Sequence, residues 1–288
     1  MITVRPYRGL DDLRRIQALQ VEAVRWRAPL GTPTAGDVTW WLLQHPPEDA
    51  SPKTVVVFED GDELVAWAVL WLPCTLTYGG DAHDAVLDWF EAEVVGDVLD
   101  VASLEDEPET RAPLEARGYR VDDSDGWLHH LVADLEREPA EPVLPAGYRL
   151  ASVDEALLAS RVDAHRSAFE PSRVTVASYR TVTETPPYRA ELDVVAVADD
   201  GTVASYALAW LDEANGIGEL EPVGTHAEHR RRGLARAVCT EALRRLRAAG
   251  AHTCLVYSVG GSDATALYES VGFRTIDRHV TWRRVRNP

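Results

Sequence analysis

The chain has 288 residues, of which 45% are hydrophobic and 26% charged, as in globular rather than disordered proteins. This length allows one large or two ordinary domains. A net charge of −18 argues against nucleic acid or an anionic membrane as partners. The sequence has no apolar run near the roughly 20 residues of a membrane span and no signal-peptide pattern after Met1. Its three cysteines lack metal-site spacing, so we expect reduced thiols in a cytoplasmic protein, and no metal site.

The acidic excess lies in the first half of the chain. Residues 1–137 include 27 acidic and 11 basic residues, a balance of −16, whereas residues 138–288 include 20 and 18, a balance of −2. Two interpretations are open. The acidity can serve solubility, or it can attract a cationic small substrate such as a polyamine or an aminosugar.

The first half predicts a strand, a helix and a hairpin in that order. Residues 3–7 form the strand, and residues 11–26 carry apolar side chains at helical spacing. Residues 54–58 and 64–72 flank an acidic turn and form the hairpin. The segment after them, residues 136–147, has three prolines and a glycine with little apolar periodicity, and predicts an extended linker.

The second half repeats this order. A strand at residues 148–151, a helix at 155–168 and a hairpin of 193–198 with 203–211 are expected. The two halves also end alike, because 114–120 is similar to 267–274 and a β-rich segment follows each, at 127–135 and 279–285. We therefore predict two tandem copies of one α/β unit, at residues 1–137 and 147–288, joined by a linker at 138–146.

A strand containing Glu219 leads into an arginine- and glycine-bearing turn, which opens into a helix predicted from Leu234 to Ala249. Gly250 is the expected stop. Unpaired N–H groups at a helix N-terminus, the small residues Gly233 and Ala235, and adjacent arginines suit a phosphate. The alternative is a solvated arginine cluster before an ordinary surface helix.

Two motifs resemble those of the GNAT superfamily of N-acetyltransferases. Arg230-x-x-Gly233-x-Ala235 is similar to its acetyl-CoA pyrophosphate motif, and residues 264–273, ATALYESVGF, are similar to its second signature. The resemblance covers about the second half of the chain. It implies an α/β (α+β) fold of two tandem GNAT-like domains, each a mixed, mostly antiparallel sheet flanked by helices. The tandem plan resembles that of mycothiol synthases.

The resemblance also implies roles for individual residues. The acetyl and pantetheine groups of acetyl-CoA would pair with the strand backbone, the pyrophosphate would bind at the turn, and Ser262 would donate to the pantetheine. The implied cofactor-binding residues are Val223, Gly224, Thr225, Arg230, Arg231, Arg232, Gly233, Leu234, Ala235, Arg236, Ser262 and Tyr268.

Tyr268 would also protonate the leaving thiolate, although it could instead simply pack under Phe273. The base is open: Glu219 and Glu221 lie two apart on one strand and share a face, and His226 is a third candidate. The implied reaction is direct acetyl transfer to a primary amine of a small molecule, by a monomer or homodimer. A non-catalytic CoA-binding module is the alternative, and a dinucleotide-binding domain is disfavoured because the turn has one glycine.

The first copy lacks the phosphate turn. At the corresponding place it has Gly79 and Gly80 followed by Asp81, Asp84 and Asp88, whose charges would repel a pyrophosphate. We therefore expect one cofactor per chain and a first copy that covers hydrophobic surface and walls the substrate cleft.

Overall fold

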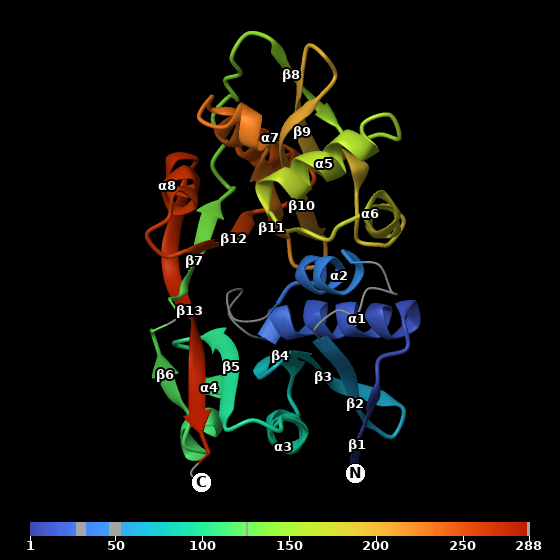
Figure 1. The fold of residues 1–288 in the computed structure, drawn as a ribbon, viewed down its shortest axis with the longest axis vertical. Coiled ribbons are helices and arrows are strands. Elements are labelled where there is room, and N and C mark those ends of the chain that lie inside the picture. The colour runs from blue at the N-terminus through green and yellow to red at the C-terminus, as the bar shows by residue number, and fades with distance from the viewer. Residues whose placement is uncertain (27–32, 46–52, 125, 287–288) are drawn as a thin grey trace.

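We describe a computed structural model of the chain over residues 1–26, 33–45, 53–124 and 126–286. Figure 1 shows the two halves of the chain stacked along the long axis of the molecule. The elements of the first half are β1 (Ile2–Pro6), α1 (Leu10–Trp26), α2 (Ala35–Leu43), β2 (Lys53–Asp60), β3 (Glu63–Trp71), β4 (Thr75–Gly80), α3 (His83–Glu93), β5 (Val98–Leu104), α4 (Pro108–Ala116), β6 (Arg120–Asp122) and β7 (Leu128–Asp134).

The second half follows a segment without helix or strand between Asp134 and Tyr148, where the linker was predicted. Its elements are β8 (Tyr148–Ser152), α5 (Leu158–Ala168), α6 (Val176–Thr183), the short 3-10 turn η1 (Ala190–Leu192), β9 (Asp193–Ala198), β10 (Val203–Asp212), β11 (Ile217–Thr225), the 3-10 turn η2 (Ala227–His229), α7 (Leu234–Ala248), β12 (Thr253–Val259), α8 (Asp263–Ser270) and β13 (Phe273–Val285).

All the strands in the described part of the chain join one 13-stranded sheet, whose order is β1-β2-β3-β4-β5-β13-β7-β12-β11-β10-β9-β8, with β6 paired to β13. Neighbours are antiparallel except for the pairs β4–β5 and β11–β12, which are parallel. The five strands β1 to β5 and the five strands β8 to β12 therefore repeat one pairing order. The mixed, mostly antiparallel sheet flanked by helices is the fold class that the sequence predicted.

The two halves exchange their last strands. β7 belongs to the first half in sequence but pairs with β12 of the second, from Leu128↔Val259 to Asp134↔Thr253. β13 pairs with β7 over its first part and then with β5 of the first half, from His279↔Leu104 to Val285↔Val98. Figure 1 shows β13 running from the second half into the first. The predicted boundary at residues 138–146 divides the sequence, and it stays a prediction of domain organisation.

Several helices differ from the sequence prediction, which did not contain α3, α4 or α6. α5 begins at Leu158 rather than Glu155, because the Asp154 side chain accepts the Leu157 N–H (3.0 Å) and forms a turn first. α2 was not predicted at all. In contrast, α7 ends at Ala248, one residue from the predicted end, and Gly250 follows with φ +103°. None of the helices in the described ranges combines the length and apolar character needed to cross a bilayer.

Candidate functional site

The candidate site lies along the part of β11 that is no longer paired with β12. β11 pairs in parallel with β12 from Ile217 to Glu219, and no pairing with β12 follows within the described strands. On its other side the register with β10 shifts, so that Glu221 and Pro222 stand opposite one residue of β10. Pro222, which has no N–H to donate to a strand ladder, lies within this bulge. The backbone of Val223, Gly224 and Thr225 therefore lies beyond the end of the β11–β12 ladder.

The turn after β11 leaves a helix end unpaired. Gly233 is the N-cap of α7 with φ +77°, a conformation that glycine adopts without strain, and no side chain caps the helix. Arg231 precedes it with φ +62°. The first N–H groups of α7 have no partner within their own helix and carry its positive dipole end. This geometry suits an anionic group such as a phosphate.

A cavity of about 580 Å³ lies against this turn, and we call it the turn cavity. It is lined by ten of the twelve predicted cofactor residues, which are Val223, Gly224, Thr225, Arg230, Arg231, Gly233, Leu234, Ala235, Arg236 and Tyr268. The structure thus brings strand, turn and α8 residues together around one space.

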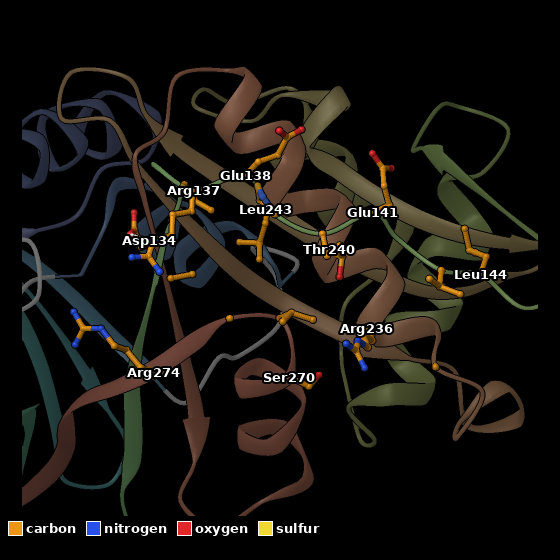
Figure 2. Close-up of a pocket in the computed structure, with 18 of the residues that line it drawn as sticks. Asp134, Arg137, Glu138, Glu141, Leu144, Arg236, Thr240, Leu243, Ser270 and Arg274 are labelled. Carbon is orange, nitrogen blue, oxygen red and sulfur yellow. Dashed lines mark ion pairs between the residues drawn. The ribbon is translucent and has the colours of Figure 1, made fainter.

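Arg232 and Ser262 are not among the residues that line the turn cavity. Arg232 donates to the Tyr148 hydroxyl (2.9 Å) and lines a hollow of about 1120 Å³. Figure 2 shows this hollow, with Glu138 and Glu141 of the linker and Arg236 and Thr240 of α7 among the residues that line it. That hollow meets the turn cavity at Gly233 and Arg236. The Ser262 hydroxyl is the N-cap of α8 and accepts the Thr265 N–H. Its contact with pantetheine stays a prediction.

A second cavity, of about 470 Å³, opens beside the turn cavity, and we call it the inner cavity. The two share Phe169, Val223, Ala264 and Tyr268. Both halves of the chain line the inner cavity. From the first half come Pro33, Asp37, Trp41, Thr77 and Leu128, and from the second half Glu221, Tyr257, Ser258, Val259 and His279.

Tyr268 lies where the two cavities meet. It is 6% exposed, and its ring packs edge-on against Phe273 with centroids 5.7 Å apart. The predicted packing role is therefore present, together with a position at the cavity junction. Burial, followed by nearby Cys239 and Glu221, raises the pKa of its phenol well above the ordinary value of 10. The group is protonated at neutral pH and can act as a proton donor.

The two strand glutamates differ in surroundings. Glu221 lines the inner cavity, and burial together with the charge of Asp37 raises its pKa to about 8. Glu219 is 1% exposed and does not line either cavity. Its carboxylate accepts the Thr34 hydroxyl, and burial and Asp37 raise its pKa well above 4.5. His226 instead faces Asp163 (3.7 Å) and accepts the Glu228 N–H within η2.

Asp37 is the residue that sequence reasoning missed. It is the third residue of α2, its carboxylate accepts the Thr34 N–H (2.9 Å), and the Thr34 hydroxyl accepts its own N–H in return. Burial raises its pKa to about 6, although hydrogen bonding with Glu219 opposes this shift. The signal was present, because Thr34-x-x-Asp37 before an apolar run is a capping-box pattern. That pattern predicts a helix start but not a partner 182 positions away in the sequence.

Comparison with known proteins agrees with this architecture. Residues 200–283 match the model of the FR47-like protein family. Comparison with curated proteins gives no match. A tandem GNAT protein from the clavulanic acid biosynthesis pathway is similar in structure, with a TM-score of 0.66 at 19% identity over 100% of this chain and 99% of that one.

Two further structures are similar over nearly the whole chain. A GCN5-related N-acetyltransferase from Sphaerobacter thermophilus has a TM-score of 0.60 at 19% identity, over 100% of this chain and 96% of that one. A GNAT-family acetyltransferase from Colwellia psychrerythraea has a TM-score of 0.61 at 13% identity, over 98% and 99%. At these identities the likeness shows the fold. The likeness confirms the predicted fold of two tandem GNAT-like units.

Proposed function

We propose that the chain transfers an acetyl group from acetyl-CoA to the primary amine of a small molecule, by direct transfer. Glu221 accepts a proton from the amine, and Tyr268 gives one to the leaving sulfur. The observation that carries this proposal is the meeting of two cavities at Tyr268, one against an uncapped helix N-terminus and the other lined by Glu221.

The residues around the turn fit acetyl-CoA. The N–H groups at the start of α7 and the arginines at 230, 231 and 236 would hold its pyrophosphate. Beyond the chain neighbours of Gly233, no atom of the described residues lies within 4 Å of the position that a Cβ there would take, so the approach to the helix end is open. The backbone of residues 223–225, beyond the end of the β11–β12 ladder, would pair with the pantetheine arm.

Acetyl-CoA supplies an activated thioester, so the protein has only to position the amine and move protons. An ammonium ion R–NH₃⁺ that becomes an amide forms one C–N bond, and the C–S bond breaks. The nitrogen loses two protons, of which one ends on the sulfur and the other in solvent. Glu221, as a carboxylate, accepts a proton from the nitrogen, and the Tyr268 phenol supplies the proton for the sulfur and is restored from solvent. Glu219 is buried behind them and is not the base.

Amine-dependent thiol release from acetyl-CoA tests the proposal, with the product identified by mass spectrometry. We expect release with primary amines and none with alcohols of the same carbon skeleton. If calorimetry finds tight CoA binding but no amine gives release, the chain is a non-catalytic CoA-binding module.

A further inference from the structure

The inner cavity is built across the two halves, and α2 is the element that joins them. α2 belongs to the first half but packs against β10 and α6 of the second. A side chain at Gly36 would come within 2.3 Å of the Trp210 ring, so the helix approaches β10 closely. The Ser178 hydroxyl donates to the carbonyl of Gln44, the C-cap of α2 (2.8 Å). These contacts fix Asp37 opposite β11.

Trp40 strengthens this attachment. Its ring packs edge-on against His165 and Tyr179, with centroids 5.2 and 6.2 Å apart, within the core of the second half. α2 is therefore packed against the second half through both Gly36 and Trp40. Because close-packed contacts leave little freedom of movement, the residues of α2 that line the cavity are held in one position.

The ionisable lining of the inner cavity is acidic. Asp37 and Glu221 both line it, and none of the described residues that line it is an arginine or a lysine. His279 also lines the cavity and would carry a positive charge if protonated. Burial lowers its pKa to about 4, so its ring is neutral at pH 7. Glu219 interacts directly with Asp37 from behind the lining.

This arrangement of carboxyl groups favours the binding of a cation. Glu219 has the more strongly raised pKa and holds the proton of the pair, which leaves Asp37 as a carboxylate at neutral pH. A buried carboxylate is costly without a positive partner. An ammonium group between Asp37 and Glu221 would supply that partner.

Most of the remaining lining is aromatic or apolar, and Thr77 and Ser258 add two hydroxyl groups. Trp41 and Phe169 face the cavity, together with Tyr257 and Val259. Aromatic faces attract ammonium groups and also bury apolar carbon. The lining therefore suits a small molecule with one cationic end and an apolar body.

We propose that Asp37, supplied by the first half, binds the ammonium group of the acceptor opposite Glu221, so that the inner cavity selects primary amines with an aromatic or branched apolar body. This inference rests on the proposed function and names the substrate class of the same site. It gives the first half a direct part in substrate recognition.

Calorimetric titration of the 288-residue chain, saturated with CoA, tests the inference without allowing transfer. The probes are 2-phenylethylamine, its alcohol 2-phenylethanol and the acid 3-phenylpropionate. We expect the amine to bind at least about ten-fold more tightly than the alcohol and the acid, because a charge-assisted hydrogen bond is lost with each replacement. Equal binding of amine and alcohol, preference for the acid, or no amine binding at millimolar concentration would each contradict the inference.

The Asp37→Asn variant tests the residue itself. Asparagine keeps the oxygen that accepts the Thr34 N–H but removes the charge. We expect amine affinity to fall roughly ten- to hundred-fold, with alcohol and CoA affinities preserved. Asp11→Asn, which removes a charge from a side chain that is 93% exposed, is the matched control and should leave amine affinity as it was. Undiminished amine affinity in Asp37→Asn would overturn the assignment.

The two proposals can fail separately. If Asp37→Asn does not fold, the comparison of amine with alcohol on the unmodified chain still decides whether the cavity selects ammonium ions. Selective amine binding without thiol release from acetyl-CoA would reject the proposed transfer and leave the cavity assignment standing. If thiol is released from acetyl-CoA and the KM for the amine is the same in Asp37→Asn as in the unmodified chain, the proposed transfer stands and the role of Asp37 is rejected.

Discussion

At the scale of residues, the site depends on three carboxyl groups with different surroundings. Glu221 lines the inner cavity, whereas Glu219 is enclosed by Thr34 and Asp37. Burial raises the pKa of all three groups, because the charged form loses hydration. The sequence could place both glutamates on one strand face but could not separate them. α2 gives the two glutamates different surroundings, because its start places Thr34 and Asp37 against Glu219. The sequence pattern that predicts the start of α2 is independent of the pattern in β11.

Replacing each glutamate by glutamine distinguishes their roles. The pKa of Glu221 is about 8, and a base must be ionised, so we expect kcat with saturating amine to rise with pH through about 8. In Glu221→Gln this rise should disappear, with kcat lower by about 10²- to 10⁴-fold. In Glu219→Gln the rise should remain and the loss should be smaller. A pH–rate profile of each variant makes the comparison, and a surviving rise in Glu221→Gln would reject Glu221 as the base.

Tyr268→Phe tests the proton donor with little change in packing. The phenylalanine ring keeps the contact with Phe273 and lacks the acidic hydroxyl. We expect kcat to fall by roughly 10²-fold while the affinity for CoA and the unfolding temperature stay close to those of the unmodified chain. An unchanged kcat would leave Tyr268 with a packing role.

At the scale of elements, the strand, turn and helix around Gly233 could be predicted from the sequence. The helical period, the glycine and the arginines follow from local chemistry, so α7 was predicted to within one residue of its end. Gly224 shows what local reasoning lacks. A side chain there would come within 2.4 Å of the Tyr206 hydroxyl, a clash between separate strands that the sequence does not reveal.

An acidic residue in the first turn of α7 separates binding from stability. Ala235 is the second residue of α7 and lines the turn cavity. Ala235→Asp should weaken CoA binding about ten-fold or more by repelling the pyrophosphate. The same charge favours the helix dipole, so the unfolding temperature should hold or rise slightly.

The matched control lies in α6. Ala177 is the exposed second residue of that helix, and it lies away from both cavities. Ala177→Asp should therefore leave CoA binding unchanged in the same titration. Equal CoA affinity in Ala235→Asp and Ala177→Asp would mean that the start of α7 is not the pyrophosphate site.

At the scale of the whole molecule, the internal repeat was predictable but the exchange of strands was not. Residues 127–135 and 279–285 read as β-rich ends of their own halves, because period and composition do not say which strand a segment joins. In the structure β7 and β13 each complete the sheet of the other half. Packing of α2 against β10 and β11 of the second half brings Asp37 to Glu219, so the parts of the site that the sequence missed depend on long-range contacts.

One continuous sheet predicts one cooperative unfolding transition. Seven of the nine tryptophans lie within residues 1–137, so tryptophan fluorescence is weighted toward the first half even though Trp40 packs in the core of the second, whereas far-ultraviolet circular dichroism reports on both halves. We expect the two thermal transitions to coincide, and CoA bound in the second half to raise both midpoints together. Separate midpoints, or a CoA effect absent from tryptophan fluorescence, would indicate two independent domains.

The central claim is amine acetylation at a cavity shared by the two halves, and amine-dependent thiol release from acetyl-CoA tests it most directly. The 288-residue chain should release thiol with primary amines that have an apolar body, in proportion to the acetylated amine found by mass spectrometry. Tight binding of CoA with the same background release whether or not an amine is present would contradict the account.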